Sequence, residues 1–227
     1  MKKVLGLKHA VIAAAVAASV APALASAEIS GSLGMSSQYL WRGQSLFQGG
    51  TIFGSLDYAH ASGLYAGAWT SSENDKTEYD LYAGFGGETD GGFSYDISYI
   101  DYNYSGPGNA ACGGNDEDDC DFGEVHLGAG YAGFGADAYI GVGDYGHGAA
   151  QSDNKDNYYA LSYTYDKITG AVGYYDFDDT SLQYTHVDLS YALTDQFAFG
   201  ISKIVDQDTD DTYEDDLQFV VSYTFNL

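Results

Sequence analysis

The sequence is built from short segments in which apolar and polar side chains alternate. The last segment is the clearest, because from Leu217 to Leu227 every odd position is apolar and the even positions are mostly polar. Successive side chains of a strand point to opposite faces, so each segment predicts a β-strand with one apolar face. The other segments place their apolar faces at Ile29, Leu33, Met35 and Tyr39; Ile52, Leu56 and Tyr58; Tyr79, Leu81 and Phe85; Phe93, Tyr95, Ile97 and Tyr99; Val125, Leu127, Ala129 and Tyr131; Phe134, Ala136, Ala138, Ile140 and Val142; Tyr159, Leu161, Tyr163 and Tyr165; Val187, Leu189, Tyr191 and Leu193; and Phe197, Phe199 and Ile201.

Two more segments, residues 64–69 and 168–175, have an extended pattern but are rich in Gly and aromatic residues on both faces. With them the sequence predicts about twelve strands of about ten residues, the length that crosses a bilayer when the strand is tilted. Tyr and Trp near the strand ends are expected at the two bilayer interfaces as an aromatic girdle. The residues assigned to this girdle are Tyr39, Trp41, Tyr58, Tyr131, Tyr165 and Tyr191.

The connections between these segments are alternately short and long. Short ones fall at Ala61-Ser62, Thr89 to Gly91, Ala132-Gly133, Asp166-Lys167 and Thr194-Asp195, and long acidic ones at Leu40 to Gln48, Ser71 to Lys76, Asn103 to Asp121, Tyr145 to Lys155, Asp178 to Ser181 and Asp206 to Asp215. A membrane barrel with periplasmic turns and outward loops requires this alternation, whereas a soluble sandwich does not. The sequence therefore predicts an all-β fold, a transmembrane antiparallel up-and-down β-barrel of about twelve strands. The alternative is a secreted β-sandwich or a lipocalin-like barrel.

The N-terminus has the three regions of a bacterial signal peptide. They are the basic residues Lys2, Lys3 and Lys8, the apolar stretch from Ala10 to Val20, and the small residues Ala25, Ser26 and Ala27. We therefore expect residues 1–27 to be an export signal and residues 28–227 to form an outer-membrane barrel. The later sequence contains no run of roughly 20 apolar residues, so no transmembrane helix is expected.

The charge of the part after residue 27 excludes one class of partner. It has five basic against 33 acidic residues, a net charge of −28, and nucleic-acid binding needs clustered Lys and Arg. The 22 Tyr and 11 Phe argue against an acidic disordered chain, which carries few aromatic residues.

The long loops hold the candidates for a disulfide and for loosely bound cations. Cys112 and Cys120 are the only cysteines, and pairing is expected in an oxidising compartment; a two-cysteine metal site is the less favoured alternative. Acidic clusters offer oxygen ligands to Ca²⁺, although a solvated acidic loop is the plainer interpretation. Their residues are Asp116, Glu117, Asp118 and Asp119, and Asp206, Asp208, Asp210 and Asp211. No cofactor and no firm metal site are predicted.

If the apolar face meets lipid, the opposite face lines the lumen. That face carries the carboxylates of Asp57, Glu78, Asp80, Asp96, Glu124, Asp137 and Asp188, and Arg42 is the only arginine of the chain. Carboxylates along a narrow lumen attract cations and repel anions. The sequence thus favours a small channel for cationic or neutral solutes.

Two other functions stay open. The lumen carboxylates could be core polar groups of a closed barrel, with Arg42 as their structural counter-ion. A barrel hydrolase is the third possibility, because His126 and His186 face inward two residues from Glu124 and Asp188, and a His beside a carboxylate could act as a general base. No serine-centred motif accompanies them.

The N-terminal third carries a more specific pattern. It consists of Ser37-Gln38-Tyr39-Leu40-Trp41-Arg42-Gly43-Gln44-Ser45, then Gln48-Gly49-Gly50, then Asp57-Tyr58-Ala59-His60-Ala61-Ser62-Gly63-Leu64-Tyr65-Ala66-Gly67-Ala68-Trp69. This resembles the opening of the TorF-type porins, bacterial outer-membrane proteins of largely unknown function. The resemblance extends loosely to the C-terminal strand and implies an outer-membrane channel, without assigning roles to residues. The expected partners are outer-membrane lipids, the barrel-assembly machinery and small cationic or neutral solutes; the oligomeric state is left open.

Overall fold

The computed structural model describes residues 27–73, 76–105, 121–145 and 152–227. Nearly all of the expected signal peptide, both cysteines and the acidic residues 116–119 lie outside these ranges, so the signal peptide, the Cys112–Cys120 disulfide and cation binding by Asp116 and Asp118 stay predictions.

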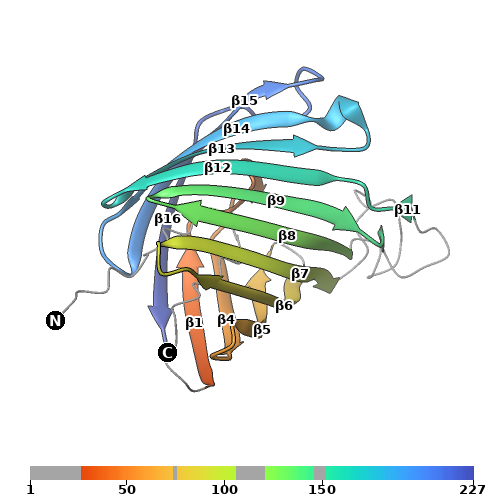
Figure 1. Ribbon diagram of the computed structural model, residues 1–227. Coiled ribbons are helices and arrows are strands. Elements are labelled where there is room, and N and C mark those ends of the chain that lie inside the picture. Colours follow the sequence, from red (N-terminus) through yellow and green to blue (C-terminus); the bar gives the residue numbers. More distant parts are fainter. Residues whose placement is uncertain (1–26, 74–75, 106–120, 146–151) are drawn as a thin grey trace.

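A closed antiparallel barrel of twelve strands makes up the described chain (Figure 1). It closes where β1 pairs with β16, for example Met35 with Tyr223, and this confirms the fold and the strand number expected from the sequence. The strands are β1 (Glu28–Ser36), β4 (Thr51–Ala59), β5 (Leu64–Ser72), β6 (Thr77–Glu88), β7 (Phe93–Ser105), β8 (Phe122–Tyr131), β9 (Phe134–Val142), β12 (Asn157–Tyr165), β13 (Ile168–Asp176), β14 (Tyr184–Ala192), β15 (Phe197–Gln207) and β16 (Gln218–Asn226).

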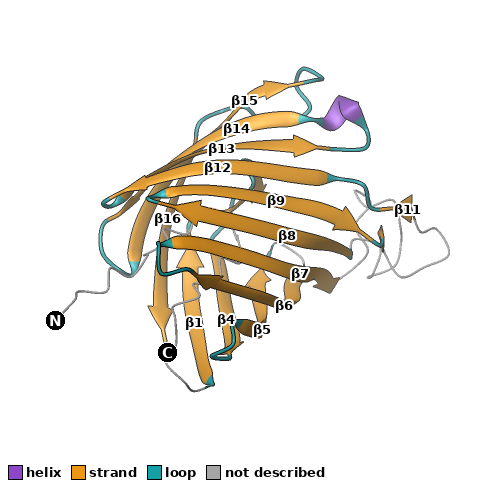
Figure 2. Cartoon of the chain, viewed as in Figure 1, coloured by secondary structure: helices purple, strands orange, loops and turns teal. Residues whose placement is uncertain are grey.

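Little other regular structure accompanies the barrel in these ranges (Figure 2). Two short hairpins, β2 (Tyr39–Trp41) with β3 (Gln44–Phe47) and β10 (Asp144–Tyr145) with β11 (Ser152–Asp153), form separate two-stranded sheets. A 3₁₀ turn, η3 (Thr180–Leu182), lies between β13 and β14. None of the described helical residues forms a helix long and apolar enough to span a membrane.

Short and long connections lie at opposite ends of the barrel. The short turns β6–β7, β8–β9 and β12–β13 lie together on the left of Figure 1, and β11 lies at the other end. The two ends of the barrel chain, Glu28 in β1 and Leu227 after β16, belong to the short-turn end, because β1 pairs from Glu28 with Ala59 at the end of β4. By the rule for outer-membrane barrels, this is the periplasmic end.

The exterior of the barrel is apolar along the strands. Most of the side chains that the sequence assigns to the apolar face are exposed, including Leu56, Leu81, Ile97 and Leu161. The two ambiguous segments follow the same rule, because Leu64 in β5 and Val172 in β13 are among the exposed residues that point outward. A closed sheet leaves no unpaired strand edges, so it is compatible with lipid, and an apolar outer wall is stable there.

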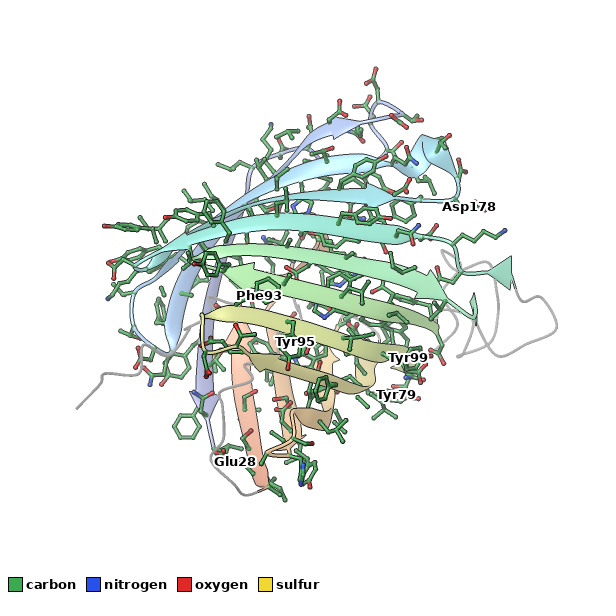
Figure 3. The ribbon with its side chains drawn as sticks, in the orientation of Figure 1. Glu28, Tyr79, Phe93, Tyr95, Tyr99 and Asp178 are labelled. Atoms are coloured by element: carbon green, nitrogen blue, oxygen red, sulfur yellow. The ribbon has the colours of Figure 1, made fainter. Side chains whose placement is uncertain are left out.

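Aromatic residues lie near both ends of this apolar wall. Figure 3 shows Phe93 and Tyr95 toward one end and Tyr79 and Tyr99 toward the other, all on the outside. The girdle residues expected from the sequence and found exposed at the short-turn end are Tyr58, Tyr131, Tyr165 and Tyr191. An apolar wall between aromatic girdles is typical of an outer-membrane barrel, so the protein is an outer-membrane protein.

The assignment of Tyr39 and Trp41 to this girdle is wrong. Tyr39 is only 5% exposed, and both residues belong to β2, which is not part of the barrel wall. The alternation of apolar and polar residues in β1 continues in the sequence as far as Tyr39, but the wall strand ends at Ser36 and the chain then leaves the wall.

A charge introduced at mid-wall tests the membrane orientation. Leu81 lies near the middle of β6 and is 51% exposed, so Leu81→Arg is expected to lower the free energy of unfolding in lipid by about 2–4 kcal/mol. The control is Leu217→Arg beside the long-loop end of β16, where a cost of about 0–1 kcal/mol is expected. Denaturant unfolding in bilayers measures both, and an equal, small cost at the two positions contradicts a lipid-facing Leu81.

Candidate functional site

The segment after β1 folds into the barrel as a hairpin. Ser37 is the last residue of this segment whose backbone bonds to the backbone of a wall strand. Its N–H donates to the Val221 carbonyl at 2.9 Å, and its hydroxyl accepts from the Val221 N–H at 3.0 Å. The following residues Tyr39, Leu40 and Arg42 are buried. The expectation that residues 40–48 form an outward loop is therefore wrong, because this segment carries apolar side chains and an arginine that find partners in the lumen. We call β2, β3 and their turn the lumen hairpin (residues 39–47).

The tip of the lumen hairpin has an unusual backbone. Arg42 has φ 47° and Gly43 has φ 86°, and a left-handed conformation costs a non-glycine residue about 1 kcal/mol or more. A Cβ on Gly43 would lie 2.6 Å from the Cβ of His186 in β14. Only glycine thus allows the tip to approach the wall so closely, and the contacts of Arg42 must offset its backbone strain.

The strongest of those contacts is an ion pair with Glu124 of β8. Arg42 Nη1 donates to Glu124 Oε1 at 2.8 Å, and Nη2 donates to Oε2 at 2.6 Å. Arg42 is 4% exposed and Glu124 is 1% exposed. This two-pronged geometry is the most favourable one for an arginine and a carboxylate, and each residue neutralises the other in a buried setting.

Aromatic rings surround the same guanidinium. Its central carbon lies 4.5 Å from the ring centres of Tyr139 and Tyr158 and 5.3 Å from that of Tyr175, and Nη1 also donates to the Tyr175 hydroxyl at 3.2 Å. Trp41 of the hairpin itself lies at 4.4 Å. A cation near aromatic faces is attracted by the ring quadrupoles, by about 0.5–2 kcal/mol per ring. We call Glu124, Tyr139, Tyr158 and Tyr175 the arginine cage.

Tyr184 of β14 fixes the hairpin backbone from the loop side. Its hydroxyl donates to the Arg42 carbonyl at 2.8 Å and accepts from Gln44 Nε2 at 2.8 Å. Tyr213, from the loop before β16, packs on Tyr184 with ring centres 4.7 Å apart and donates to the Leu182 carbonyl. Burial raises the pKa of the Tyr213 hydroxyl to about 12, so this hydroxyl would keep its proton and continue to donate even near pH 10, where an ordinary tyrosine is about half ionised.

Two of the expected lumen carboxylates are buried beside the hairpin. Glu78 and Asp80 of β6 are each 1% exposed. Glu78 accepts from the hydroxyls of Tyr39 at 2.6 Å and Tyr104 at 3.1 Å. The loop-side half of the lumen is thus filled by side chains, and its buried apolar cluster comprises Tyr82, Ile100, Tyr102, Tyr139, Tyr158, Tyr175, Tyr184 and Ile204.

The other four carboxylates, Asp57, Asp96, Asp137 and Asp188, lie nearer the short-turn end or at mid-height and are only partly buried. Asp57 accepts from the Tyr82 hydroxyl, and Asp96 accepts from the Tyr65 hydroxyl at 2.8 Å and 2.9 Å. We call these four residues the inner carboxylates. The structure places all seven carboxylates on the inward face, in two groups with different surroundings; that they line a pore stays a prediction.

Each of the two inward histidines contacts a carboxylate, but only the partner of His186 is the one suggested by the sequence. His126 lies between Asp96, 3.1 Å from Nδ1, and Asp137, 2.9 Å from Nε2, whereas the expected partner Glu124 is taken by Arg42. His186 contacts Asp188 at 3.2 Å as expected. His126 thus has its partners on the neighbouring strands β7 and β9 and not two positions away on its own strand.

The remaining sequence candidates do not assemble into a site in the described part of the chain. Asp206, Asp208 and Asp210 are exposed at and after the end of β15. Among the residues that the structure describes, no group of three His, Cys, Asp or Glu side chains is arranged to hold a metal ion.

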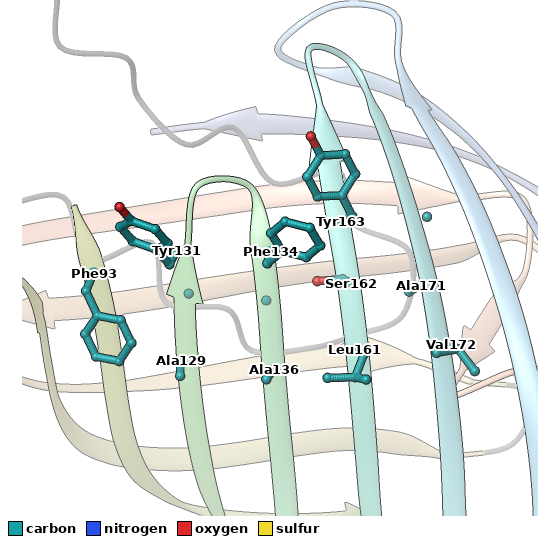
Figure 4. A pocket seen from close by; sticks show the side chains of 13 residues that line it. Phe93, Ala129, Tyr131, Phe134, Ala136, Leu161, Ser162, Tyr163, Ala171 and Val172 are labelled. Atoms are coloured by element: carbon teal, nitrogen blue, oxygen red, sulfur yellow. The ribbon is translucent and has the colours of Figure 1, made fainter. Parts of the chain in front are cut away.

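An apolar groove of about 540 Å³ lies on the outer wall over β8, β9, β12 and β13 (Figure 4). Small residues such as Ala129 and Ala136 form its floor, and Phe93, Tyr131 and Tyr163 stand around it. Because these side chains belong to the apolar outer face, the groove meets lipid rather than solutes in the lumen.

Comparison with known proteins agrees with this architecture. A model of a bacterial protein family of unknown function, Gcw_chp, matches residues 20–225. The chain belongs to this family. No curated protein matches the sequence.

Among solved structures, the KdgM porin in complex with disordered oligogalacturonate is similar at a TM-score of 0.50 and 10% identity, over 88% of this chain and 98% of KdgM. OccD3 (OpdP) of Pseudomonas aeruginosa has a TM-score of 0.45 and 15% identity, over 90% of this chain and 66% of its own. The KdgM likeness shows that the chain has a porin fold.

Breaking the buried ion pair from either side should destabilise the protein. Arg42→Met and Glu124→Gln each leave a buried group without its partner, so each is expected to lower the free energy of unfolding by about 3–5 kcal/mol. The double variant removes both charges and should lose less than the sum of the single variants, by about 1–3 kcal/mol. A double-mutant cycle from denaturant unfolding measures this coupling, and strict additivity would show that the pair does not act as a unit.

Proposed function

We propose that the protein is an outer-membrane channel for small solutes, of the TorF type, and that it prefers cations. The proposal includes export by a signal peptide at residues 1–27, which leaves residues 28–227 as the barrel. Lipids and the barrel-assembly machinery are the partners that such a barrel needs. The porin fold and the apolar outer wall support a channel in general, and the lumen charges support the preference for cations.

The observation that carries the cation preference is the distribution of lumen charge. The inner carboxylates are partly exposed, and the nearby basic side chain, Arg42, is buried and paired with Glu124. Of the other basic residues, Lys76 lies at the long-loop end, Lys155 and Lys167 lie in connections, and Lys203 lies on the outer face of β15. Asp96 and Asp137 share His126, and Asp188 contacts His186, so the inner carboxylates still outnumber these histidines by four to two. Low-dielectric walls focus the remaining negative field, which attracts cations and repels anions.

Passage also requires room in the loop-side half. In the conformation described, the lumen hairpin and the surrounding tyrosines fill that half, so solutes would pass only when the hairpin moves. The same packing favours a second candidate, a permanently closed barrel in which Arg42 is a structural counter-ion. The two candidates differ in whether the unmodified protein conducts before the hairpin is removed.

Neutralising the inner carboxylates tests the cation preference. The triple variant Asp96→Asn, Asp137→Asn and Asp188→Asn is expected to lower the K⁺ over Cl⁻ permeability ratio by about twofold or more, because it removes part of the negative field. Reversal potentials in planar bilayers under a salt gradient measure this ratio. The matched control is Asp206→Asn, Asp208→Asn and Asp210→Asn, the same charge change on the exposed loop, which should have a smaller effect. Anion preference in the unmodified protein would contradict the proposal.

Removing the lumen hairpin tests the channel itself. Replacing residues 39–47 by a short Gly-Ser linker leaves the pairing of β1 with β4 intact, since that ladder ends at Ser36 and Thr51. Single-channel conductance is expected to rise several-fold, because the loop-side half loses its filling. Excising the exposed loop residues 209–212 is the control and should change conductance little. If the unmodified protein gives no channels and only the hairpin-deleted barrel conducts, the closed-barrel candidate is correct. A deletion variant that folds, as judged by heat-modifiable migration, yet gives no channels contradicts the proposed channel.

A further inference from the structure

The arginine cage is a structure of the barrel wall and not of the hairpin that occupies it. Its residues come one each from four strands that are neighbours in the barrel: Glu124 from β8, Tyr139 from β9, Tyr158 from β12 and Tyr175 from β13. The cation inside belongs to a different segment, 82 residues before Glu124. The inner side of the wall thus forms the receptor, and Arg42 enters it from the lumen hairpin, which is not part of the wall.

The chemistry of the cage is that of a receptor for an organic cation. A carboxylate that accepts two parallel N–H bonds matches a guanidinium, and aromatic faces around a cation are the usual means of binding guanidinium and alkylated ammonium groups. The contacts between Arg42 and the cage residues all involve its guanidinium: the fork to Glu124, the bond to Tyr175 and the two rings of Tyr139 and Tyr158. Outside the cage, the Arg42 carbonyl accepts from the Tyr184 hydroxyl. A free guanidinium compound can make the same cage contacts without the arginine backbone.

The occupant is held in a way that permits exchange. β2 and β3 pair only with each other and form a sheet separate from the barrel wall, so leaving the lumen breaks no ladder of the barrel. Arg42 also sits in a left-handed conformation with φ 47°, which relaxes when the tip is released. Near its far end the hairpin segment is held by an exposed hydrogen bond from Gln48 to Glu214 at 3.0 Å.

We propose that the arginine cage is a binding site for the guanidinium or alkylammonium group of an organic cation, and that Arg42 is a built-in stand-in which such a cation displaces together with the lumen hairpin. The inference deepens the proposed function and rests on it for the route by which the cation arrives. It names the class of solute, since inorganic cations gain little from aromatic rings in competition with an arginine. It also supplies the trigger that opens the loop-side half.

Chemical rescue tests the cage directly. Arg42→Ala leaves Glu124 buried without its partner, and methylguanidinium is expected to refill the cage and raise the melting temperature of this variant in detergent. Methylurea, a neutral molecule of nearly the same shape, should not. In the double variant Arg42→Ala, Glu124→Gln the apparent affinity for methylguanidinium should fall at least tenfold. Absence of rescue, or equal rescue by methylurea, overturns the proposal.

Displacement is tested in a protein that keeps Arg42. The chain has two tryptophans, and Trp69→Phe makes Trp41 the only one, so its emission reports the hairpin. Methylguanidinium should shift this emission to the red in a saturable way, at higher concentration than in Arg42→Ala because the tethered Arg42 competes; methylurea should not. No shift at a hundredfold above the concentration that half-saturates Arg42→Ala would make Arg42 a permanent counter-ion and overturn the stand-in role.

Both measurements are independent of ion conduction. Rescue and displacement in a barrel that never conducts would disprove the proposed channel while leaving the cage as a cation receptor. A conducting barrel that shows neither rescue nor displacement would keep the channel and remove the cage. If Arg42→Ala does not fold, as shown by loss of heat-modifiable migration, the Trp41 titration decides the inference: a saturable red shift with methylguanidinium and not with methylurea supports it, and no shift up to the highest methylguanidinium concentration at which the barrel stays folded overturns it.

Discussion

The ion pair between Arg42 and Glu124 is the interaction on which the arrangement of the lumen depends. Removing two charges from water is costly, and a buried pair is tolerated only with good geometry and further polar partners. Here the fork of two hydrogen bonds, the Tyr175 hydroxyl and the surrounding rings supply both. The pair also explains the local backbone, because it offsets the left-handed conformation of Arg42 and fixes the tip where only Gly43 fits against His186.

The barrel makes this pair possible by its size and by its alternation of faces. Twelve strands enclose more space than the eight-stranded barrels that side chains alone can fill, but less than the open porins of 16 to 18 strands. A hairpin therefore fits inside together with large side chains. Since every second residue faces inward, residues such as Tyr139 and Tyr158 on paired neighbouring strands, directly opposite in register, build a continuous aromatic surface on one side of the lumen.

The sequence alone gives the wall but not its contents. Period-two alternation predicts which side chains meet lipid, and the short turns predict the ends of the strands, because both signals are local. The lumen hairpin could not be predicted, because the alternation of apolar and polar residues in β1 continues to Tyr39 although the chain already leaves the wall at Ser37. The partners of Arg42 and His126 could not be predicted for another reason. Strand register brings Glu124 and Asp137 within reach of them, and the closed barrel as a whole sets that register.

The seven inward carboxylates form two groups at different heights along the barrel axis, and this separation has a physical consequence for selectivity. Seven uncompensated carboxylates along a narrow lumen would repel one another and bind any cation strongly, and strong binding slows conduction because a permeating ion must also leave. Glu124 is instead neutralised by Arg42, and Glu78 accepts two tyrosine hydroxyls. In the proposed channel, the long-range field comes mainly from the inner carboxylates, whereas the arginine cage in the loop-side half is the part proposed to recognise the solute at short range. Under these proposals charge preference and solute identity depend on different residues, so that each could change without the other.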